Sequence, residues 1–201
     1  GEKYAEFDGK GMLYHAFSCF FFERLHKQGI ATHFIERCSP IAMRVHKLRI
    51  VPLEMVYRRI AAGSLCKRTG LPKGEQLREP IVEPYYKRDV LGDPILAPAH
   101  IFLMELVSPT AYKQLVQQTR VLGDLLTTWL REVDFELVDM KLEFGWDVHS
   151  SLLLGDEISP DTMRIWDRHT GESHDKDVFR HDLAPLIPRY QEVARRLQID
   201  V

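Results

Sequence analysis

The sequence has few cysteines, no long apolar run and almost no net charge, and each of these shortages excludes a class of protein. Its 201 residues include three cysteines without CxxC spacing, so we expect reduced thiols rather than a disulfide framework or a zinc site: Cys19, Cys38 and Cys66. No apolar run approaches the roughly 20 residues that span a bilayer. The formal charge of −2 gives no overall attraction to nucleic acid or to an anionic membrane.

Several common catalytic motifs are also missing. The sequence has no HExxH metal motif, no GxSxG, no Walker A pattern and no GxGxxG dinucleotide fingerprint. At 45% hydrophobic and 28% charged residues, it has the composition of a chain that buries a full core, as one domain or as two closely joined lobes.

Hydrophobic periodicity predicts three helices and six strands. The helices are expected at 11–28, at 109–130 after a Ser108 cap, and at 183–197. The strands are expected at 30–35, 43–48, 53–60, 81–86, 135–144 and 152–157, with Pro52 separating the second from the third. This mixture of hairpins and segregated helices predicts the α+β class.

The expected strand 135–144 carries ionisable residues on one face. Because strand side chains alternate, one face would hold Asp139, Lys141 and Glu143, and the other Val138, Met140, Leu142 and Phe144. If a hairpin closes at 147–150, Glu143 comes roughly opposite Asp156, and two such carboxylates suit a hard cation such as Mg²⁺. The alternative is a solvated face with cross-strand ion pairs.

Three further segments are candidates for a site. In YRRIAAGS, Arg58 and Ser64 flank small residues and could hold a phosphate, although the segment could also be a tight packing turn. GDEISPDTMRIWD (155–167) mixes charges with large apolar groups, which indicates a partly buried site or a core tryptophan with capping charges. YYKRDVLGDP (85–94) is too polar for a core and too aromatic for a simple linker.

The motifs together resemble one known family. DMKLEFG (139–145) followed by GDEISPDTMRIWD resembles the SAICAR synthetase (phosphoribosylaminoimidazole-succinocarboxamide synthase) family of purine biosynthesis. The likeness covers essentially the whole chain in order, through FDGKG, GIATHFI, KLRIVPLEMVYRRIAAGSLCKR, EPIVEPYYKRD, GDPI, DKDVFR and YQEVARRL.

The resemblance implies a function and an architecture. Family enzymes use ATP and Mg²⁺ to join L-aspartate to the carboxylate of carboxyaminoimidazole ribonucleotide (CAIR), giving SAICAR, ADP and phosphate. The implied fold is α+β, with a kinase-like N-terminal nucleotide lobe packed on a larger α+β substrate lobe. Residues 1–50 would be the remainder of the first lobe, and 51–201 the catalytic lobe. We expect a cytoplasmic enzyme with small-molecule partners, no nucleic acid or membrane partner, and a homodimeric assembly.

The resemblance also assigns roles to residues of this sequence. The reacting carboxylate and aminoimidazole would be lined by Asp139, Lys141 and Asp93. The ribonucleotide 5′-phosphate would be held by Arg58, Ser64 and Arg164, with Lys176 and Arg180 at other anionic substrate groups. ATP would contact Lys47, Lys87 and Glu143, and Mg²⁺ would lie on Glu143 and Asp156.

Departures from the family pattern leave two alternatives open. The glycine-rich LYEGKAK-type hairpin of the family would precede Gly1, Arg59 stands where Asn is frequent, and Gly92 stands where His is frequent. One alternative is therefore a truncated relative that binds the ribonucleotide without ATP turnover. The other is an RNA-binding protein, which would use Tyr57, Arg58, Arg59, Lys67 and Arg68, although the sequence lacks an aromatic stacking array.

Overall fold

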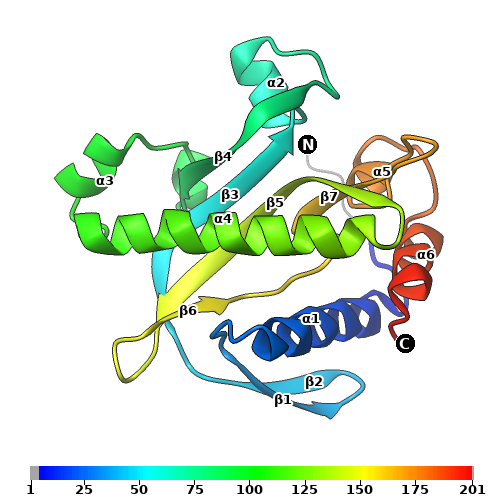
Figure 1. Cartoon of the computed structure of the whole chain (residues 1–201), viewed down its shortest axis with the longest axis horizontal. Coiled ribbons are helices and arrows are strands. Elements are labelled where there is room, and N and C mark those ends of the chain that lie inside the picture. The colour runs from blue at the N-terminus through cyan, green and yellow to red at the C-terminus, as the bar shows by residue number, and fades with distance from the viewer. Residues whose placement is uncertain (1–4, 201) are drawn as a thin grey trace.

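Five antiparallel strands form the main sheet, in the order β4–β3–β5–β6 with β7 also paired to β5 (Figure 1). These strands are β3 (Arg49–Ile60), β4 (Gln76–Tyr86), β5 (Phe135–Trp146), β6 (Leu152–Gly155) and β7 (Met163–Asp167). A separate hairpin consists of β1 (Phe34–Ser39) and β2 (Ala42–Val45). This computed structural model describes residues 5–200.

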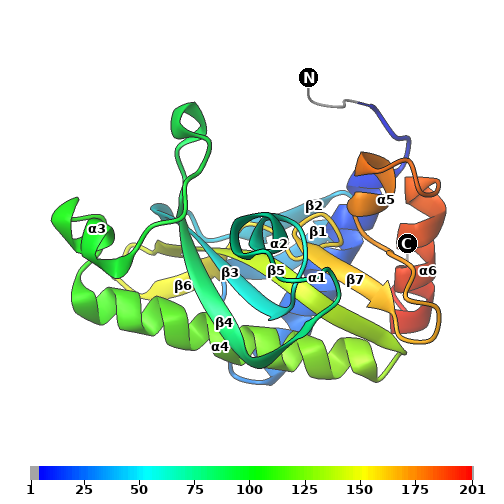
Figure 2. The same cartoon turned by 90° about the horizontal axis from the view of Figure 1, so that it is seen from above.

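One helix, α4 (Pro109–Arg131), crosses a face of this sheet, and another, α1 (Lys10–Lys27), lies beyond its β6 edge (Figure 1). The longest, α4 (Pro109–Arg131), begins where the Ser108 hydroxyl accepts a hydrogen bond from the backbone N–H of Ala111 at 3.1 Å. It crosses one sheet face, while α1 (Lys10–Lys27) lies beyond β6 with the β1–β2 hairpin outside it (Figures 1 and 2). The other helices are α2 (Ser64–Thr69), α3 (Pro98–Leu103), α5 (Asp177–Arg180), α6 (Leu186–Leu197) and the 3₁₀ turn η1 (Asp89–Leu91).

The packing of α4 decides which face of the sheet is available for a site. Alternate residues of β3 are buried in the core: Val51, Leu53, Met55 and Tyr57. The Tyr57 hydroxyl donates to Asp124 of α4 at 2.6 Å, and Gly123 of α4 lies directly on the Tyr57 ring. Because side chains alternate along a strand, Glu54 and Arg58 of β3 lie on the opposite face.

The predicted helices and most of the predicted strands are confirmed, with shifted ends. The last helix begins at Leu186 rather than at 183, and the first predicted strand forms at Phe34–Ser39. The prediction that Pro52 separates two strands is wrong, because β3 runs through it with a shift of register between Ile50 and Glu54 against β5. The short elements β7, α2, α3 and α5 were not predicted from periodicity.

One side chain of β5 faces the other way from the prediction. The pairing of β5 with β7 shifts register between Leu137 and Asp139. Leu137 and Met140 therefore both join the main core, whereas Val138 packs with Ile60 and Ala62 in a small separate cluster. The prediction for Val138 is wrong because the irregularity interrupts the two-residue period.

The α+β class is confirmed. The main hydrophobic core includes residues of α1, β3 and β5. The boundary expected between residues 50 and 51 falls inside β3, and the division into two lobes stays a prediction. The three cysteines are free thiols. Among residues 5–200, no helix is long and apolar enough to cross a membrane.

Candidate functional site

The sheet face away from α4 carries a continuous group of polar side chains. Register places Arg58 beside Asp139 and Glu54 beside Glu143, with Glu54 also beside Tyr85 of β4. We call this group the charged face, and its members are Glu54, Arg58, Glu83, Tyr85, Asp139, Lys141 and Glu143. Neighbouring strands thus bring together residues that lie up to 89 positions apart in the sequence, from Glu54 to Glu143.

Arg58 is the centre of one end of the charged face. It is only 3% exposed, and it donates to Glu83 and Asp139 at 2.7 Å each, to Ser64 Oγ at 3.0 Å and to Tyr85 Oη at 3.1 Å. Burial alone would lower the pKa of Arg58, but the charges of Asp139 and Glu83 outweigh it and raise the pKa. The guanidinium therefore stays charged while buried.

Arg164 of β7 meets the same carboxylate. Its Nη1 donates to the two oxygens of Asp139 at 3.1 and 2.8 Å, and its Nε donates to Asp177 at 2.7 Å. Gly63, with a φ of 54°, permits this arrangement, because a Cβ at that position would lie 2.6 Å from Arg164 Nη2. We call Arg58, Ser64 and Arg164 the arginine end, and its two guanidiniums and a hydroxyl are donors that suit a phosphate.

Lysines dominate the other end of the charged face. Lys141 donates to Glu54 at 2.7 Å and to Glu143 at 3.0 Å, and Lys87 also pairs with Glu143. Burial would raise the pKa of Glu143, but the hydrogen bonds from Lys87 and Lys141 outweigh it and hold that pKa below its ordinary value. Glu143 is therefore a buried, ionised carboxylate, and we call Lys87, Lys141, Glu143 and the adjacent Asp156 the lysine end.

Asp156 lies one residue beyond the position predicted for it. The hairpin pairs Glu143 with Gly155, and Asp156 follows β6 in a left-handed backbone conformation with a φ of 59°. Desolvation raises the pKa of Asp156, and the negative charge of the nearby Glu143 raises it further.

The chemistry of these two carboxylates fits Mg²⁺. Oxygen ligands suit Mg²⁺, which commonly takes one or two protein carboxylates and completes its shell with water and substrate phosphate. Within residues 5–200 there is no group of three or more histidine, cysteine, aspartate or glutamate side chains arranged to hold a metal. Glu143 and Asp156 would therefore hold the ion together with phosphate oxygens rather than enclose it.

The remaining predicted site residues lie around the charged face. On its α5 side, Lys176 Nζ donates to the main-chain oxygen of Asp161 and Arg180 lies 3.5 Å from Asp177, which is the partner of Arg164. Asp93 accepts from the backbone N–H of Arg88 at 2.7 Å, in a loop that projects from the sheet (Figure 2).

Two other expectations depend on exposure. Lys47 is exposed in the connection between β2 and β3. Among the residues named for RNA binding, Tyr57 is fully buried against α4 and Arg58 is engaged by carboxylates, so neither presents a free surface for stacking.

Sequence reasoning missed the carboxylates that balance the two arginines. Glu83 accepts from Arg58 and from Arg68, and Asp177 accepts from Arg164. For Glu83 the available signal was the two-residue period of β4, which places Ile81, Glu83 and Tyr85 on one face of the strand. For Asp177 the signal was the alternation of charges in DKDVFR, which does not by itself identify a partner.

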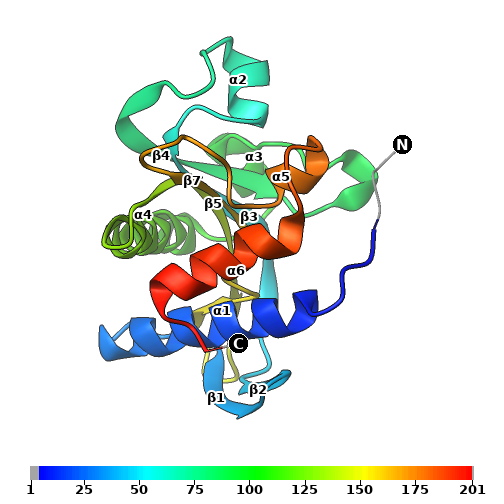
Figure 3. The same ribbon diagram turned by 90° about the vertical axis from the view of Figure 1, so that its right-hand side faces the viewer.

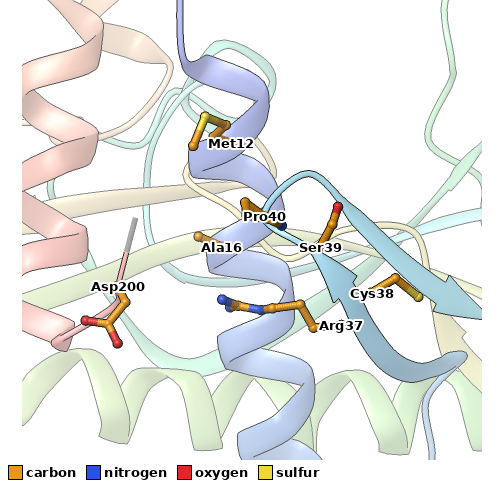
Figure 4. A pocket seen from close by; sticks show the side chains of 7 residues that line it. All are labelled: Met12, Ala16, Arg37, Cys38, Ser39, Pro40 and Asp200. Atoms are coloured by element: carbon orange, nitrogen blue, oxygen red, sulfur yellow. The ribbon is translucent and has the colours of Figure 1, made fainter.

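One cavity lies away from the charged face. It has a volume of about 360 Å³, between α1 and the β1–β2 hairpin, and Figure 4 shows its lining residues: Met12, Ala16, Arg37, Cys38, Ser39, Pro40 and Asp200. Its charged side chains are one arginine and one aspartate. It shares no residue with the arginine end or the lysine end.

Comparison with known proteins places the chain in a family. The SAICAR synthetase family model matches residues 1–197. The chain belongs to the SAICAR synthetase family. It is 45% identical over 197 residues to the phosphoribosylaminoimidazole-succinocarboxamide synthase of Bacillus subtilis (strain 168), covering 98% of this chain and 82% of that protein. It is 47% identical over 197 residues to the synthase of the same name from Anoxybacillus flavithermus, with the same coverage.

Solved structures of SAICAR synthetases share the fold. The enzyme of Pyrococcus horikoshii OT3 has a TM-score of 0.94 at 44% identity, covering 98% of this chain and 87% of that chain. A SAICAR synthetase (Type-2) in complex with ADP has a TM-score of 0.95 at 44% identity, covering 98% of this chain and 84% of that chain. The resemblance drawn from the motifs, the fold and the assignment to a class of ligases are thereby confirmed.

Proposed function

We propose that this SAICAR synthetase family member activates the carboxylate of CAIR with ATP and then joins it to L-aspartate. In the first step, the γ-phosphoryl group moves to a carboxylate oxygen, giving ADP and an acyl phosphate. In the second, the aspartate nitrogen attacks the acyl carbon, the carbon–oxygen bond to phosphate breaks, and the nitrogen loses its proton as the amide SAICAR forms. The charged face carries this proposal, because it has phosphate-binding donors around Asp139 and a carboxylate pair, Glu143 and Asp156, four residues further along β5 and just beyond β6.

The arginine end would hold the 5′-phosphate of the ribonucleotide. Arg58 and Arg164 are already fixed by shared contacts to Asp139, so little side-chain freedom is lost when a phosphate binds. Ser64 Oγ, which accepts from Arg58, has a hydroxyl hydrogen to donate to the same phosphate.

The lysine end would hold the ATP phosphates. Lys87 and Lys141 supply positive charge there, and Glu143 with Asp156 supplies the oxygen ligands for Mg²⁺. When bound, the ion would neutralise charge on the transferring phosphoryl group. Glu143 lies four residues from Asp139 along β5, or about 13 Å at roughly 3.3 Å per residue, which leaves the middle of the charged face for the reacting carboxylate. Asp139 and Lys141 would line it.

The other expectations are retained as parts of this proposal. Lys47 would lie beside the adenine, between an N-terminal lobe ending at residue 50 and the catalytic lobe. Asp93 would approach the reacting groups from the loop that follows β4, the strand that leads to Lys87. The cytoplasm, where ATP and purine precursors are available, is the proposed location, and a homodimer is the proposed assembly.

ADP release tests the proposed function directly. The chain is incubated with Mg²⁺, ATP and CAIR, with and without L-aspartate, and we expect aspartate-dependent release of ADP and formation of SAICAR. Absence of release from folded protein would contradict the ligase proposal. Calorimetric binding of CAIR in that same sample would then favour the alternative of a relative that binds the ribonucleotide without turning over ATP.

A further inference from the structure

The segment between α1 and β1 runs along the outer edge of β6. Thr32 forms a parallel bridge with Leu154 of β6, and the backbone N–H of His33 donates to the main-chain oxygen of Leu154 at 2.7 Å. The segment leaves the end of α1, which lies between the main sheet and the β1–β2 hairpin (Figure 3). β6 ends at Gly155, and Asp156 follows it. The segment therefore reaches the turn that carries one of the two carboxylates proposed to hold Mg²⁺.

His33 places a buried imidazole beside that turn. The side chain is 9% exposed and packs edge-on against the Phe22 ring of α1, with 5.1 Å between the ring centroids. A Cβ added to Gly155 would lie 3.6 Å from His33 Nδ1, so this nitrogen is close to the last residue of β6. The imidazole also forms a hydrogen bond with the main chain of Asp156.

The direction of this hydrogen bond follows from its effect on the ring. Burial lowers the pKa of His33 to about 4, and the charge of His46 lowers it further, whereas the hydrogen bond to Asp156 acts to raise it. A contact that raises the pKa of a histidine favours the protonated ring, so the imidazole donates and the main-chain oxygen of Asp156 accepts. His33 Nε2 has no partner among residues 5–200, which leaves Nδ1–H as the donor.

Two hydrogen bonds act on the peptide group that joins Asp156 to Glu157. His33 holds the oxygen of this peptide group, and its N–H, on Glu157, donates to the Asp156 carboxylate. Asp156 itself has a φ of 59°, in the left-handed region that residues other than glycine seldom adopt. Such a conformation persists where the surrounding contacts determine it. The imidazole therefore fixes the peptide group that orients the carboxylate.

The Asp156 carboxylate needs such support because of its neighbour. The charge of Glu143 acts to raise the pKa of Asp156, so repulsion between the two carboxylates is present in the structure without ligand. Glu143 is held by hydrogen bonds from Lys87 and Lys141. For Asp156, the main-chain contacts at its turn take that part.

We propose that His33 is a positioning residue, which holds the main-chain oxygen of Asp156 and thereby keeps the Asp156 carboxylate near Glu143, where Mg²⁺ and the ATP phosphates would bind. The inference rests on the proposed function and adds to it a residue that acts through Asp156. Partners that orient metal-binding side chains typically contribute about 10- to 100-fold to metal affinity.

Calorimetric binding of ADP, in Mg²⁺ and in EDTA, isolates the metal-dependent part of the affinity. His33→Leu removes the donor but keeps an apolar side chain against Phe22, and Nε2 has no partner among the described residues to lose. In Mg²⁺ the variant should bind ADP about tenfold or more weakly than the wild type. In EDTA the two proteins should bind ADP equally, and their affinities for CAIR should also be equal.

Two further variants distinguish positioning from a general effect on the fold. The amide of His33→Asn places an N–H close to the position of Nδ1, so its affinity for ADP in Mg²⁺ should return to near the wild-type value. The control Thr32→Val changes a similarly buried neighbour whose hydroxyl contacts His26 at 2.8 Å. Thr32→Val should lower the Tm without changing the ratio of the ADP affinities in Mg²⁺ and EDTA. If circular dichroism shows that His33→Leu is unfolded, His33→Gln, whose amide extends to the position of Nε2, takes its place.

Failure of the positioning role is distinguishable from failure of the proposed function. If Mg²⁺ strengthens ADP binding equally in the wild type and in His33→Leu, His33 does not position Asp156 and the ligase proposal stands. Equal losses in Mg²⁺ and EDTA, or no recovery in His33→Asn, would also overturn the positioning role. If Mg²⁺ does not strengthen ADP binding by the wild type, the positioning role and the metal assignment both fail. Absence of aspartate-dependent ADP release from the wild type would overturn the proposed function itself.

Discussion

Replacement of Arg58 by alanine tests the arginine end of the charged face. The guanidinium makes charge-assisted hydrogen bonds to Glu83 and Asp139, each worth about 1.5–3 kcal/mol. Neither carboxylate is left unpaired in the variant, because Arg68 still contacts Glu83 and Arg164 still contacts Asp139. The loss should therefore be about 3 kcal/mol, at the lower end of the roughly 3–5 kcal/mol measured when a buried pair is broken.

This loss has two measurable consequences. At roughly 2–4 °C per kcal/mol for a chain of this length, Arg58→Ala should lower the Tm by roughly 6–12 °C. Loss of a charge-assisted contact to phosphate should also weaken CAIR about 10- to 100-fold in calorimetry, with a smaller effect on ATP. The control Arg44→Ala removes an exposed ion pair to Glu36 worth about 0–1 kcal/mol. A Tm for Arg58→Ala equal to that of the control, or equal weakening of CAIR and ATP, would refute the reasoning.

Three other perturbations separate catalysis, packing and protonation. Glu143→Ala should abolish ADP release while CAIR still binds in calorimetry, because the change removes a carboxylate proposed to hold Mg²⁺ at the ATP phosphates and leaves the arginine end intact. Wild-type turnover would contradict the metal assignment. Gly123→Ala should lower the Tm, since a Cβ would lie 2.4 Å from the Tyr57 ring and overpacking costs about 1–3 kcal/mol. In contrast, the control Gly11→Ala in α1, where the described residues leave open space, should raise the Tm slightly. Burial raises the pKa of Asp175 to about 6 from an ordinary 3.8. Between about pH 4 and pH 6 the folded protein therefore keeps the Asp175 proton, whereas the unfolded chain has released it. Because the folded state binds the extra proton, this group makes the free energy of unfolding fall as pH rises through that interval. Asp175→Asn should reduce that fall in urea unfolding, and an unchanged pH slope would contradict the assignment.

The sequence predicted the elements that are long and periodic. The helix at Pro109–Arg131 has a cap and a continuous apolar face, so local chemistry alone identified its beginning, and the alternation in β5 identified Asp139, Lys141 and Glu143 as residues of one face. Their partners include Glu54, which pairs with Lys141, and Arg58, which pairs with Asp139, and both come from another strand, β3. Those contacts depend on strand order and register, which a two-residue period does not specify.

Irregularities account for the predictions that were wrong. Register shifts in β3 and β5 are formed by tertiary pairing, so neither the passage of β3 through Pro52 nor the reversal of Val138 had a local signal. The register of β5 with β6 likewise pairs Glu143 with Gly155, so Asp156 lies one residue past the position expected for it opposite Glu143. The two-residue period does not predict which strands pair or in what register. The family resemblance does imply that pairing, because members of one family share one fold.

The pairing of the arginines explains how the charged face stays both buried and ready to bind. A buried guanidinium without a counter-charge would be strongly destabilising, so Arg58 and Arg164 require Asp139 even in the absence of substrate. Two cations share that one carboxylate, and their other partners, Glu83 and Asp177, lie on β4 and at the start of α5. The network therefore ties β4, β3, β5, β7 and α5 into one arrangement before any phosphate arrives. A ligand then finds donors already oriented, and the cost of fixing them has been met by folding rather than by binding.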